Sequence, residues 1–95
     1  MSDFDPVYVN IPCPTKKEGI ELCTKMLEKD LCGTAKIQEG VRLMWKEESV
    51  NDADVVLINL KTTKGNIPKI HEFILHNHSW KTPCIEVLPL VSDMC

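Results

Sequence analysis

Positive charge is scarce in this 95-residue chain, and the scarcity excludes one large class of function. Eleven lysines and arginines stand against fourteen acids, the net charge is −3, and Arg42 is the only arginine. Proteins that bind nucleic acids neutralise phosphates with clustered lysine and arginine side chains. We therefore expect no nucleic-acid partner.

Long apolar runs are also missing. No stretch approaches the roughly 18 apolar residues that a membrane-spanning helix needs. The first residues, Met1-Ser-Asp-Phe-Asp-Pro6, carry acids where a secretory leader carries positive charge. The sequence predicts a cytoplasmic protein without a membrane span.

Cysteine is present, but no Cys-x-x-Cys pair is. The five cysteines are an odd number at irregular spacing, which favours reduced thiols over a disulfide framework or a zinc ribbon. They are Cys13, Cys23, Cys32, Cys84 and Cys95. Linkers rich in proline, glycine or serine are absent too, so we expect residues 1–95 to form a single domain.

The first half of the chain predicts a strand, a helix and a second strand. Val7–Pro12 is rich in β-branched residues and should bend and end near Pro12. Thr15 and Glu18 have the spacing of a capping box, and Gly33 is placed to end the helix in the left-handed conformation. The expected buried face of that helix comprises Ile20, Leu22, Cys23, Met26, Leu27 and Leu31. Apolar residues alternate from Thr34 to Trp45, with a bend expected at Gly40.

The second half predicts a strand, a helix and a strand. A turn over Lys46–Asp52 precedes the apolar run Asp54–Leu60, which is typical of a strand covered on both faces. Asn66 can cap the next helix, whose apolar stripe comprises Ile67, Ile70, Phe73 and Ile74. Ile85–Pro89 completes the order βαββαβ. We therefore expect an α+β fold of the ferredoxin-like type, with an antiparallel sheet and two helices on one face.

The segment from His76 to Pro89 reads His-Asn-His-Ser-Trp-Lys-Thr-Pro-Cys-Ile-Glu-Val-Leu-Pro. It resembles the closing motif of the CutA family, His-Pro-Tyr-x-x-Pro-Glu followed by an apolar strand and Leu-Pro. The resemblance extends over about Val7 to Leu90. Its other anchors are Pro14, Gly40, Trp45 and the pair Lys61-Thr62.

The resemblance implies a homotrimeric, non-enzymatic protein that binds a divalent metal ion, with copper the first candidate, and contributes to metal tolerance. The subunits would meet through the Val41–Trp45 strand region and Trp80. No resident cofactor is implied beyond Cu²⁺ or another divalent cation. The alternative is a scaffold, or a sensor of small ligands like the P-II signalling proteins, in which metal binding is incidental.

The ligands that the resemblance implies are only partly present. Copper-binding members have been linked to a cysteine on the first strand, the histidine of the closing motif and a nearby glutamate. In this chain Ile11 takes the place of the cysteine, His78 keeps the histidine and Cys84 takes the place of the glutamate. Cys13 would share the face of Ile11 if the strand continued. The expected metal ligands are thus His78, Cys84 and Cys13, and the family's terminal Tyr-Leu-x-Trp segment has no counterpart in the sequence.

Three other features have both a functional and an ordinary interpretation. His76 can chelate together with His78 only in extended backbone, and His71 shares a face with His78 only in a long helix. The turn Thr62–Gly65 precedes a helix and can hold an anion or serve simply as a connection. The acidic residues Glu47, Glu48, Asp52 and Asp54 can attract a cation or be solvated. Spacing reveals no nucleophile paired with a base, so we predict no enzymatic activity.

Overall fold

The structure is a computed structural model, and it describes residues 3–91. Two α-helices and four strands follow one another in the order β-α-β-β-α-β, with a short 3₁₀ turn before the second helix. The elements are β1 (Pro6–Cys13), α1 (Lys16–Glu28), β2 (Thr34–Lys46), β3 (Val50–Thr63), η1 (Lys64–Asn66), α2 (Ile67–Asn77) and β4 (Glu86–Pro89). Cys95, one of the expected free thiols, lies outside the described residues.

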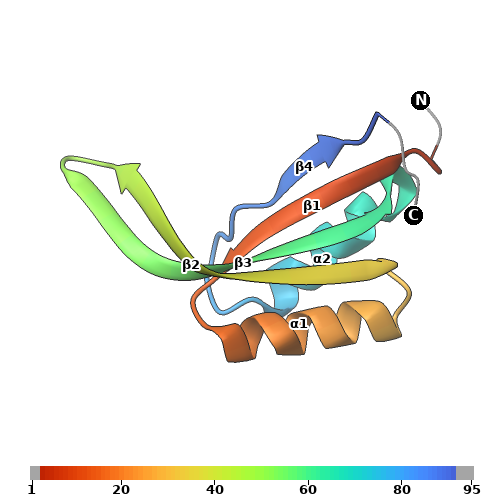
Figure 1. Cartoon of the computed structure of the whole chain (residues 1–95), viewed down its shortest axis with the longest axis horizontal. Helices are drawn as coiled ribbons and strands as arrows, with labels where there is room; N and C mark the ends of the chain where they lie inside the picture. Colours follow the sequence, from red (N-terminus) through yellow and green to blue (C-terminus); the bar gives the residue numbers. More distant parts are fainter. Residues whose placement is uncertain (1–2, 92–95) are drawn as a thin grey trace.

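The strands form one sheet in the order β2-β3-β1-β4, and every neighbouring pair is antiparallel. Both helices pack on the same face, because the buried core joins alternate residues of β1 to apolar side chains of α1 and α2 (Figure 1). The α+β expectation, with an antiparallel sheet and two helices, is confirmed. The core comprises Val7, Val9, Ile11, Cys13, Leu22, Cys23, Met26, Leu31, Cys32, Ile58, Leu60, Ile70 and Ile74.

β1 does not bend at Pro12. The strand continues to Cys13, and its pairing with β3 runs without a break from Pro6 opposite Thr63 to Cys13 opposite Val56. β4 pairs with the other edge of β1 only as far as Asn10. Pro12 lacks an N–H, and no β4 residue faces it there to require one. Cys13 therefore shares the buried face of Ile11.

α1 begins as expected and ends differently. The Glu18 N–H donates to Thr15 Oγ1 at 3.2 Å, which is half of the expected capping box. The helix ends at Glu28, and Asp30, not Gly33, adopts the left-handed conformation with φ 57°. The N–H groups of Asp30 and Leu31 bond the carbonyls of Leu27 and Met26, the pattern of a Schellman motif.

The buried face of α1 is rotated from the expected one. Ile20 and Leu27 are exposed, whereas Gly19 is buried beside Leu22, Cys23 and Met26. A Cβ added to Gly19 would lie 3.2 Å from Ile58 Cγ2, so the missing side chain lets the helix approach β3 closely. The stripe of α2 is as expected, with Ile70 and Ile74 buried and Ile67 and Phe73 packed against them.

β2 and β3 extend beyond the rest of the sheet as a two-stranded arm, formed by residues 41–46 and 50–55 (Figure 1). Gly40 has φ 73°, and the register shifts between Gln38 and Val41, so the expected bend is a bulge at the base of the arm. The turn is shorter than predicted, because β3 starts at Val50 and not at Asp54. β3 lies between β1 and β2, but α1 and α2 cover only one of its faces. The prediction that both faces of this strand are covered is therefore wrong.

Candidate metal site

Cys13 lies at the end of β1, where its side chain points into the core with 0% of its surface exposed. Burial raises the pKa of this thiol from the ordinary 9.0 to about 12, with smaller contributions in the same direction from the Glu18 carboxylate and Cys23. The thiol is therefore protonated at neutral pH. A metal ion that bound its sulfur would have to displace that proton.

His78 follows α2 directly, and its backbone N–H caps the helix by donating to Ile74 O at 2.9 Å. Its ring is buried and makes two hydrogen bonds. Nδ1 accepts from the Trp80 N–H at 2.9 Å, so the ring hydrogen is on Nε2, which donates to Pro12 O at 2.7 Å. The imidazole is thus held as one neutral tautomer across a separation of 66 residues.

Glu18 projects from the first turn of α1 toward the same point. Its Oε2 accepts from the Ser79 N–H at 3.1 Å and lies 3.5 Å from His78 Nδ1. The second half of the capping box, a bond from this carboxylate back to the Thr15 N–H, was therefore wrong. The side chain instead connects the start of α1 to the segment that follows α2.

Cys13, Glu18 and His78 bring one sulfur, one oxygen and one nitrogen within 4.8 Å of one another. In the described part of the chain they are the one group of three such side chains close enough to hold a metal ion. Metal bonds of about 2.0–2.3 Å place ligand atoms in contact with one another, so the 3.5 Å between Oε2 and Nδ1 already fits. The residues present therefore suit a metal ion.

The surroundings of His78 also suit a ligand. A metal-binding histidine usually donates its other ring N–H to a carbonyl or carboxylate, which fixes the tautomer and the ring plane. The bond from Nε2 to Pro12 O does this and leaves Nδ1 as the basic nitrogen facing Glu18. A thiolate and an imidazole are donors for copper and zinc rather than for magnesium or calcium.

Two of the three expected ligands are brought together, and the third is not. Cys84 is exposed in the segment between α2 and β4 and is not part of the group. Sequence reasoning placed His78 and Cys13 among the candidate ligands but did not include Glu18, which the structure brings beside them. The spacing of Glu18 from Thr15 was assigned to helix capping, and nothing local to α1 indicates that the end of α2 lies beside it.

His76 and His71 take no part in this site. His76 Nδ1 lies 2.8 Å from Glu72 O within its own helix, so the His-x-His pair does not converge. His71 is exposed on α2. The acidic hairpin is partly neutralised, because Arg42 contacts Asp52 and Asp54 at 3.0 Å each.

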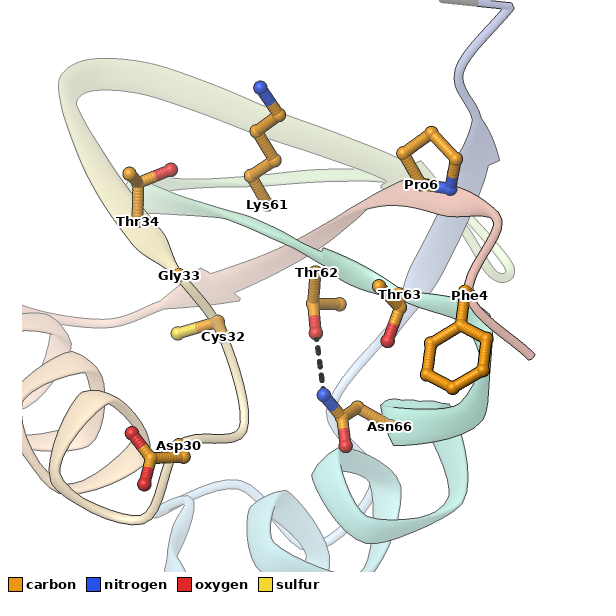
Figure 2. Close-up of a pocket in the computed structure, with 10 residues that line it drawn as sticks. All are labelled: Phe4, Pro6, Asp30, Cys32, Gly33, Thr34, Lys61, Thr62, Thr63 and Asn66. Carbon is orange, nitrogen blue, oxygen red and sulfur yellow. Dashed lines mark hydrogen bonds between the residues drawn. The ribbon is translucent and has the colours of Figure 1, made fainter. Parts of the chain in front are cut away.

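The turn after β3 is a connection rather than an anion site. The N–H groups of Lys64 and Gly65 donate to the carbonyls of Asp5 and Asp3, so they are not free to bind a phosphate. A hollow beside this turn is shown in Figure 2, where Lys61 points away from Asn66. Asn66 does not cap α2 with its side chain as expected, but donates to Thr62 Oγ1 at 3.1 Å.

Residues 7–93 match the model of the family described as CutA1 divalent ion tolerance protein. The chain belongs to the CutA1 family. It is 24% identical over 83 residues to the divalent-cation tolerance protein CutA of Archaeoglobus fulgidus, an alignment that covers 87% of this chain and 81% of the relative. The family's description names tolerance of divalent ions and no catalysed reaction.

Solved CutA1 structures have the same fold. CutA1 from Oryza sativa gives a TM-score of 0.92 at 20% identity, covering 97% of this chain and 85% of that one. The Thermus thermophilus protein gives 0.90 at 22% identity, covering 94% and 87%. The Archaeoglobus fulgidus structure, with a TM-score of 0.88 at 21% identity over 94% and 87%, is described as periplasmic. None of the helices within residues 3–91 is long and apolar enough to cross a membrane.

Proposed function

We propose that this chain is a homotrimeric, non-enzymatic protein that binds a divalent metal ion, with copper the preferred candidate, and so contributes to metal tolerance. The observation that supports the metal site is the convergence of Cys13, Glu18 and His78 within one subunit. Membership of a family described by divalent ion tolerance supports the physiological role. Cys84 stays a prediction as a further donor.

Each side chain has a distinct role in this proposal. His78 would bind through Nδ1, with its ring oriented by Pro12 O. Cys13 would supply a thiolate after losing its proton, and Glu18 would supply negative charge that offsets the charge of the ion. Because Cys13 and His78 are buried, little of the bound ion would face solvent.

The arm supports the trimer. An isolated pair of strands is marginally stable in water, and an exposed strand edge offers unpaired backbone groups to another chain. Met44, Trp45 and Val50 are 60%, 40% and 66% exposed on this arm. We propose that residues 41–46 pair with neighbouring subunits and that Trp80 lies near the contact.

Localisation in the cytoplasm is also part of the proposal. Cys13, Cys23, Cys32 and Cys84 are all free thiols in the structure. Unpaired cysteines are typical of proteins kept in a reducing compartment.

Native mass spectrometry of the reduced protein, with and without copper, tests both parts of the proposal. We expect a trimer that binds one copper per chain. His78→Ala should abolish binding, whereas His76→Ala, which alters an exposed histidine outside the site, should retain it. A trimer that binds no copper would contradict the metal function, and a monomer at micromolar concentration would contradict the assembly.

One observation favours the scaffold alternative. Both ring nitrogens of His78 are already hydrogen-bonded and the Cys13 thiol is protonated, so the site is complete as a packing arrangement. In that case metal binding is incidental and the trimer itself is the functional unit. A trimer that binds no copper in the same mass spectra would favour the scaffold, because a scaffold requires the trimer but not the copper.

A further inference from the structure

Two consecutive backbone N–H groups form hydrogen bonds to two of the three side chains of the candidate metal site. The Ser79 N–H bonds Glu18 Oε2 at 3.1 Å, and the Trp80 N–H bonds His78 Nδ1 at 2.9 Å. An amide hydrogen carries partial positive charge, so the pair supplies to these acceptors part of what a cation would supply. The segment that follows α2 thus caps the site with its own backbone.

The two acceptors differ in how many partners they can hold. A carboxylate oxygen has two lone pairs, so Glu18 Oε2 can keep the Ser79 amide and also contact an ion. The unprotonated nitrogen of a neutral imidazole has a single lone pair in the ring plane. His78 Nδ1 therefore cannot accept from Trp80 and bind a metal ion at the same time.

His78 Nε2 cannot bind the metal ion in place of Nδ1. It carries the ring hydrogen and donates it to Pro12 O at 2.7 Å, so it has no lone pair for an ion. A flipped ring would exchange Nδ1 with Cδ2 and Nε2 with Cε1, so a carbon would face the Trp80 N–H and the same amide bond would be lost. Either orientation of His78 requires the Trp80 amide to leave before metal can bind.

We propose that metal binding releases the segment of residues 80–84 from the site, through loss of the Trp80 N–H bond to His78. This inference rests on the metal function proposed above. The segment has no regular secondary structure between α2 and β4, and it carries both Trp80 and the exposed Cys84. The Trp80 ring lies 5.2 Å from the His78 ring, so its environment changes when the backbone moves. Binding of a metal ion at the buried site would therefore change the position of Trp80 and of the exposed Cys84 at the surface of the subunit.

The first test uses amide hydrogen exchange by NMR with Zn²⁺, a diamagnetic probe. Saturating zinc should speed exchange of the Trp80 amide about tenfold, the change expected from losing one hydrogen bond. The Gly33 amide, which bonds Lys61 O away from the site, should not change. In a Trp45→Phe background, Trp80 emission should shift over the same zinc concentrations.

A pair of variants tests the competition from the other direction. Trp80→Ala removes the indole but keeps the backbone N–H, whereas Trp80→Pro removes both. If the amide competes with the ion, W80P should bind zinc about tenfold more tightly than W80A. Circular dichroism of both variants checks that they fold, and the exchange experiment does not depend on either.

The possible failures are distinguishable. Stoichiometric zinc binding with unchanged exchange at Trp80 would overturn this inference and leave the metal function standing. Equal zinc affinities for folded W80A and W80P would do the same. No zinc or copper binding by the native protein would overturn the metal function, and the exchange mechanism with it.

Discussion

Raising the pH from 8 to 10 should destabilise this protein through its buried thiols. Burial raises the pKa of Cys13 from 9.0 to about 12 and that of Cys23 from 9.0 to about 11. Above pH 9 the unfolded chain loses these protons while the folded chain keeps them. Folding is then accompanied by proton uptake, so the stability contributed by the protonated thiols is full below pH 9 and falls as the pH rises.

The magnitude follows from the same values. For each thiol, the free energy of unfolding falls by about 1.4 kcal/mol for every unit that the pH rises between the unfolded and the folded pKa. At pH 10 the pH is one unit above the unfolded pKa of 9.0 for both thiols, so together they should lower the free energy of unfolding by roughly 3 kcal/mol. Cys13 and Cys23 are only 0% and 5% exposed, so solvent screening does little to reduce this cost.

Urea unfolding at pH 8 and pH 10 measures the effect, at one chain concentration and with a phosphine reductant and a chelator present. Lysine and tyrosine also titrate in this range, so the control is the double variant Cys13→Ala, Cys23→Ala. The native chain should lose about 3 kcal/mol more than the double variant between the two pH values. Equal losses would show that the thiols ionise as easily in the folded protein as in the unfolded one, which would refute the reasoning.

Three further changes should alter the urea midpoint in stated directions. Asp30→Gly should stabilise the protein by about 1 kcal/mol, because glycine adopts the left-handed conformation at φ 57° without strain; a lower midpoint would contradict this. Gly40→Ala should destabilise it by about 1 kcal/mol, since φ is 73° but no atom lies within 4 Å of the added Cβ, so an unchanged midpoint would show that the bulge relaxes freely. Ile74→Ala should cost about 2–5 kcal/mol because the side chain is fully buried, whereas Leu75→Ala on the exposed side should cost far less.

The fold could be predicted because periodicity reports it directly. The apolar residues Ala35 and Ile37 of β2 and the apolar stripe of α2 reflect contact with one continuous core, and that contact favours their conformation. The face of α1 was less predictable. Hydropathy assigns Ile20 to the core, but Ile20 is exposed. Gly19 faces β3 instead, because a residue without a side chain lets the helix approach the strand closely.

The candidate site was only partly predictable because it is assembled by tertiary contacts. Cys13 and His78 are distant in sequence, and the proline between Ile11 and Cys13 suggested a bend that pairing with β3 prevents. Glu18 has a sufficient local explanation in helix capping. Its actual partner, the Ser79 amide, is 61 residues away and leaves no local signal.

The base of the arm separates two parts of the sheet that depend differently on the rest of the molecule. Below the bulge, Gln38 faces Leu57 in a regular antiparallel pair, and β1 supports the same stretch of β3 from the other side. Joining Gln38 to Leu57 through a two-residue turn would remove residues 39–56 and only the last β1–β3 pair, Cys13 with Val56. Within one subunit the fold thus consists of a part that contains the core and the arm, an extension in which Val55 is the one buried residue. Elsewhere in the arm the core of this subunit does not constrain the sequence, and the proposed pairing with neighbouring subunits would be the constraint instead.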